Sequence, residues 1–81
     1  MNEVEETLRV LEVQLNEYKS HAERYGVLYD EFSLKCEKVL KKDVYDHIST
    51  LLFKALKFYE NKVEETSQAR DDIIKKYNIP G

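Results

Sequence analysis

Residues 4–39 read VEETLRVLEVQLNEYKSHAERYGVLYDEFSLKCEKV, and this stretch decides the fold. Its apolar residues recur at alternating steps of four and three, and they are Val4, Leu8, Leu11, Leu15, Tyr18, Ala22, Tyr25, Tyr29, Phe32, Cys36 and Val39. An average step of 3.5 residues keeps side chains on one side of a helix. The pattern therefore predicts one long helix with a coiled-coil-like seam.

The first helix is predicted to run over about residues 3–41. Asn2, with Glu5 three residues later, has the form of a capping box and places the start near Glu3. Gly26 lies off the seam and costs about 1 kcal/mol relative to alanine in a helix interior. Because the seam keeps its phase across Gly26, we predict a continuous helix. The alternative is a break near Gly26, which would give three helices.

A second helix is predicted over about residues 44–77, after the seam loses its phase beyond Val39. Asp43 is the predicted N-cap, and the lysines before it suit the negative end of the first helix dipole. No Gly or Pro marks this turn, so a continuous helix with a stutter is the alternative. A short connection makes two helices antiparallel neighbours. The predicted fold class is all-α, a two-helix hairpin forming a single domain over residues 1–81.

The second helix has more apolar surface than one neighbouring helix can cover. Two adjacent stripes follow it, one of Tyr45, Leu52, Leu56, Tyr59 and Val63, the other of Val44, Ile48, Leu51, Ala55 and Phe58. Together they occupy more than half of its circumference, whereas a helix at a protein surface buries a narrower face. We therefore expect a second copy of the chain to cover the remainder, giving a homodimeric four-helix bundle.

Six tyrosines in 81 residues are the other conspicuous feature. Tyrosine is bulky for a simple coiled-coil seam and is enriched at protein interfaces. One interpretation makes the tyrosines of the first helix bundle-core residues; the other makes residues 18–32 a docking surface. The predicted partner-binding or dimer-interface residues are Tyr18, Tyr25, Tyr29, Phe32, Ile48, Leu51, Leu52, Ala55, Phe58 and Tyr59.

The composition excludes several classes of partner and site. The net charge is −3 with acids and bases interspersed, which leaves no basic footprint for nucleic acid or an anionic membrane. The longest apolar stretch, residues 48–59, is far shorter than the roughly 20 residues that span a bilayer. A lone cysteine, Cys36, allows no intrachain disulfide and fits a reducing, cytoplasmic setting. The acidic N-terminus has no secretory signal pattern.

Candidate chemistry is sparse. Glu17 with His21, and Asp43 with His47, have the i, i+4 spacing that can share a metal, but they lack the spacing of a di-iron bundle. Cys36 lies on the apolar seam, whereas a reactive thiol needs an exposed, electropositive setting. No Gly-rich phosphate loop occurs. We predict no catalytic, metal or cofactor-binding residue and no enzymatic activity.

These observations favour a non-enzymatic protein–protein interaction module, a small self-associating helical adaptor, inhibitor or regulator. Its predicted partners are a second copy of the chain and an unidentified protein. The alternative is a structural or assembly subunit of a larger helical complex. A small helical metal or ligand carrier comes third.

Overall fold

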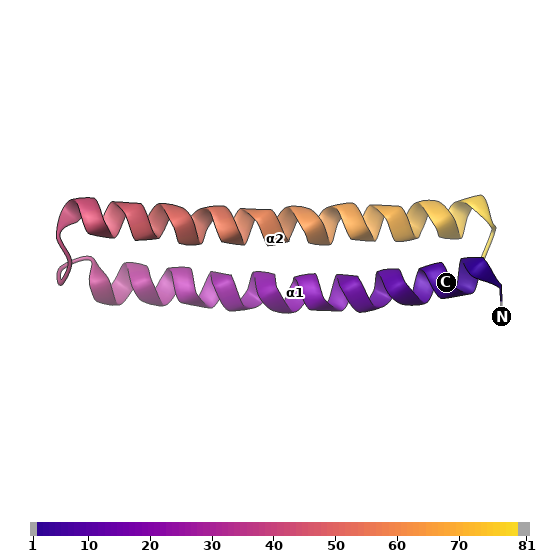
Figure 1. Ribbon diagram of the computed structural model, residues 1–81, viewed down its shortest axis with the longest axis horizontal. Helices are drawn as coiled ribbons and strands as arrows, with labels where there is room; N and C mark the ends of the chain where they lie inside the picture. The colour runs from indigo at the N-terminus through magenta and orange to yellow at the C-terminus, as the bar shows by residue number, and fades with distance from the viewer. Residues whose placement is uncertain (1, 80–81) are drawn as a thin grey trace.

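The chain folds into two long antiparallel helices that lie side by side (Figure 1). The computed structural model describes residues 2–79, with α1 at Glu3–Cys36 and α2 at Lys42–Lys76. The molecule is a rod of 55 × 16 × 15 Å. The all-α hairpin is therefore confirmed.

Gly26 does not interrupt α1, so the alternative of three helices is wrong. Its backbone has no positive φ, and a Cβ atom added there would lie 3.9 Å from Leu56 Cδ1. This is an ordinary van der Waals contact, so close packing does not require a glycine here. The uninterrupted 3.5-residue pattern predicted the continuity of the helix correctly, because one glycine weakens a helix without preventing it.

The start of α1 is capped as the sequence predicts. The Asn2 side-chain Oδ1 accepts a hydrogen bond of 2.8 Å from the backbone N–H of Glu5. This bond satisfies one of the N–H groups that have no partner inside the helix. Glu3, Glu5 and Glu6 in the first turn place negative charge at the positive end of the helix dipole. The capping motif at Asn2 therefore fixes the start of the rod.

The end of α1 differs from the prediction. The helix ends at Cys36 rather than near Lys41, and the chain makes a turn in which the N–H groups of Val39 and Leu40 both bond to the Cys36 carbonyl, each at 3.1 Å. The turn rotates the chain, so Val39 is 79% exposed and Leu40 is half-buried in its place. Val39 is therefore not part of the seam.

The start of α2 also corrects a prediction. Its N-cap is Lys41, which makes no side-chain capping hydrogen bond, and Asp43 lies inside the first turn. Asp43 Oδ1 accepts a hydrogen bond of 3.0 Å from the N–H of Val44. Asp43 thus still complements the helix dipole, but it is not the N-cap.

A Schellman motif ends α2. Asn78 has a φ of 51°, and the N–H groups of Asn78 and Ile79 bond to the carbonyls of Lys75 and Ile74, at 3.3 and 3.0 Å. Asparagine is one of the few residues besides glycine that adopts this left-handed conformation readily. The second helix thus ends within one residue of its predicted end at about residue 77.

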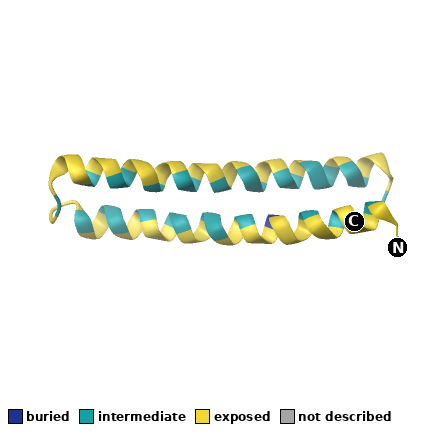
Figure 2. Cartoon of the chain, viewed as in Figure 1, coloured by how far each residue is buried: buried dark blue, intermediate teal, exposed yellow. Residues whose placement is uncertain are grey.

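The hairpin has very little core. Among residues 2–79 only Leu15 is buried, with 1% of its surface exposed. Half-buried residues line the inner faces of both helices, and the outer faces are exposed (Figure 2). A rod two helices wide gives most side chains only one neighbouring helix to pack against. Within the same range neither helix is both long enough and apolar enough to cross a membrane.

Candidate interaction surface

The seam between the helices is lined with aromatic rings. The Tyr25 ring stacks on that of Tyr59, with centroids 5.5 Å apart and an interplanar angle of 17°. Nearer the turn, the Phe32 ring stacks on Tyr45 at 5.1 Å and 10°. Offset stacking of this kind adds about 0.5–1.5 kcal/mol beyond the buried area. Aromatic pairs therefore contribute to the contact between the helices, alongside the aliphatic side chains usual in a coiled coil.

Six of the predicted interface residues lie in this seam. Tyr18 and Tyr29 face α2, with ring centroids 6.4 Å from Tyr59 and 5.8 Å from Phe53. The half-buried seam residues among the predictions are Tyr18, Tyr25, Tyr29, Phe32, Leu52 and Tyr59. This is where the bundle-core interpretation places the tyrosines. Their role in binding a partner stays a prediction.

The other four predicted interface residues lie on a second face of α2. Leu51 and Phe58 are 53% and 47% exposed, and Ile48 and Ala55 are half-buried. Val44, which is 42% exposed, extends the row toward the turn. We call this row the α2 stripe; it consists of Val44, Ile48, Leu51, Ala55 and Phe58. Its steps of four and three are those of a coiled-coil seam, and Val44, Leu51 and Phe58 keep about half of their surface exposed to solvent.

Lysine side chains cover two exposed phenylalanine rings. Lys62 Nζ lies 5.5 Å from the centroid of Phe58, and Lys57 Nζ lies 5.4 Å from that of Phe53. Each lysine also forms an ion pair of 3.2 Å, with Glu65 and Glu60 respectively. Cation–π contacts at exposed sites contribute about 0.5–1 kcal/mol. Sequence reasoning missed these pairs, although the spacing of four residues between each lysine and its phenylalanine was the available signal.

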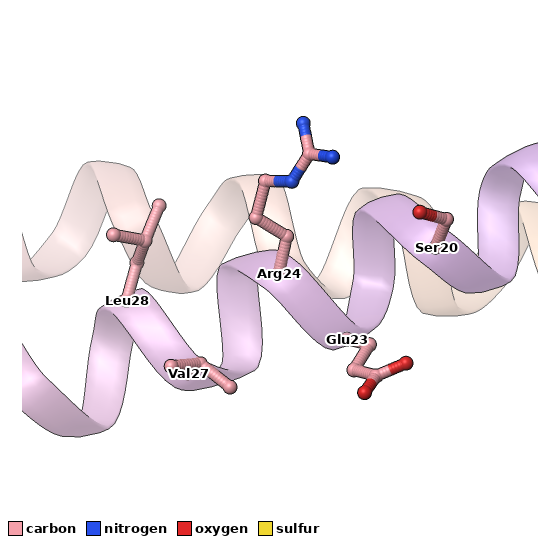
Figure 3. Close-up of a pocket in the computed structure, with 5 residues that line it drawn as sticks. All are labelled: Ser20, Glu23, Arg24, Val27 and Leu28. Atoms are coloured by element: carbon pink, nitrogen blue, oxygen red, sulfur yellow. The ribbon is translucent and has the colours of Figure 1, made fainter.

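The outer face of α1 carries a second, sparser row of exposed apolar side chains. Val13, Val27 and Leu34 are 51%, 52% and 85% exposed, and multiples of seven residues separate them on one line. A shallow depression of about 430 Å³ lies on this helix, lined by Ser20, Glu23, Arg24, Val27 and Leu28 (Figure 3). All five residues come from one helix, so the depression is open and has no opposing wall to enclose a substrate.

An ion pair joins the helices near the chain ends. Arg70 Nη1 lies 3.0 Å from Glu12 Oε1, and Arg70 Nη2 lies 3.4 Å from Asp71 Oδ1. The hydrogen bond to Glu12 is the main cause that raises the pKa of Arg70 above its ordinary value. The Arg70 Nε atom is buried without a hydrogen-bond partner. Sequence reasoning missed this contact, although Arg70 follows Leu56 and Val63 at steps of seven along the seam.

The candidate chemical groups lie apart. The His21 ring packs on that of Tyr59 at 4.9 Å, His47 is exposed on α2, and Cys36 is half-buried at the turn end of α1. Within residues 2–79 no group of three or more His, Cys, Asp or Glu side chains is placed to hold a metal ion.

Comparison with protein-family models, with curated proteins and with solved structures finds no match to this chain.

Proposed function

We propose that this chain is a non-enzymatic protein–protein interaction module, a small helical adaptor, inhibitor or regulator that self-associates and acts by binding another protein. One observation carries the proposal: Leu15 is the single buried residue of the described chain, while eleven large apolar side chains are at least 42% exposed. Fixing each backbone residue costs roughly 1–2 kcal/mol, and small domains usually need a further source of stability. Burial against another chain supplies it.

The α2 stripe is the surface we assign to this binding. Leu51 lies at its centre and Phe58 at one end, and both present about half of their surface to solvent. A row with a 3.5-residue repeat fits the side of another helix, because knobs at that spacing enter the holes between four residues of a neighbour. The expected partner element is therefore a helix running along α2.

Sedimentation equilibrium of the wild-type chain across low micromolar concentrations tests self-association. We expect a mass that rises toward twice the monomer, and a Tm that rises with protein concentration because association stabilises the folded state. Leu51→Gln should weaken both effects, whereas the matched control Leu34→Gln on α1 should leave the dimer intact. A folded monomer whose melting does not depend on concentration would reject self-association.

A second candidate function is a subunit of a larger helical assembly. The row of Val13, Val27 and Leu34 on the outer face of α1 favours it, because this row offers a second contact on a different helix. Such a chain should grow beyond a dimer or tetramer as its concentration rises, and Leu34→Gln should stop that growth. A mass that levels off at twice the monomer would exclude this candidate.

A further inference from the structure

We draw no further inference here: the strongest candidate, the α2 stripe with its exposed apolar side chains Val44, Leu51 and Phe58, carries none, because nothing in the structure shows what covers this surface.

Discussion

Gly26→Ala should stabilise the protein, because α1 is a regular helix at this position. Alanine is favoured over glycine in a helix interior by about 1 kcal/mol. The added methyl group would lie 3.9 Å from Leu56 Cδ1, in ordinary contact and without a clash. Gly26 is half-buried, so the methyl group contributes about half of the ~0.8 kcal/mol of a fully buried carbon. The expected gain in free energy of unfolding is about 1–1.5 kcal/mol.

Urea and thermal denaturation followed by far-UV circular dichroism measure this gain. For a domain of this size 1 kcal/mol corresponds to about 4–8 °C, so the Tm should rise by about 5–10 °C. Wild type and variant must be compared at one protein concentration, because association also contributes to the apparent stability.

Ala22→Gly is the matched control. Ala22 is half-buried like Gly26 and lies one turn before it in α1, so the reverse change there should cost a similar amount. An unchanged or lowered Tm for Gly26→Ala, together with the expected loss for Ala22→Gly, would refute the argument. It would mean that the helix bends at Gly26 or that a second chain packs closely on it.

Changes at three further positions probe the core, the start of α1 and the turn by the same denaturation assays. Leu15→Ala should lower the free energy of unfolding by about 2–5 kcal/mol, because it empties the one buried position of the described chain; a loss below 1 kcal/mol would contradict this. Asn2→Ala removes the 2.8 Å bond to the Glu5 N–H and should cost about 1 kcal/mol, whereas Asn2→Asp should preserve stability. Lys41→Asp should raise stability by about 0.5–2 kcal/mol, because it gives α2 the capping side chain that it lacks; no gain would show that the turn cannot place the carboxylate.

The two long helices could be predicted because the spacing of apolar residues repeats many times along each of them. From Val4 to Cys36 every predicted seam residue is at least half-buried. One weak position, such as Gly26, does not change the phase of such a pattern. The start and the stop of the rod also carried local signals, in the capping residue Asn2 and in Asn78.

The turn could not be predicted to the residue, because its geometry depends on a few backbone hydrogen bonds and on no glycine or proline. The N–H groups of Val39 and Leu40 share the Cys36 carbonyl, and Lys41 rather than Asp43 precedes α2. Val39 continued the sequence pattern and yet points to solvent. The spacing of apolar residues predicts the face on which a residue lies if the helix continues. It does not predict where the helix ends.

The candidate surface was predictable in part. Sequence reasoning found that α2 has two apolar stripes, and it assigned residues of both to binding. It could not tell which stripe α1 covers, because both share the 3.5-residue repeat and lie next to each other. In the structure α1 packs on the stripe that contains Tyr59, whose ring stacks on Tyr25, while Leu51 and Phe58 of the other stripe are exposed.

The ion pair between Arg70 and Glu12 joins residues 58 positions apart in the sequence, and this separation bears on the order of folding. In an antiparallel hairpin, contacts beside the turn close short loops, and each contact farther along closes a longer one at greater entropic cost. The contacts beside the turn should therefore form first, and the ion pair of Arg70 and Glu12 near the chain ends should form last. Because helix ends also open most readily in the native state, amide hydrogen exchange should be faster in the first and last turns of both helices than in their middle turns.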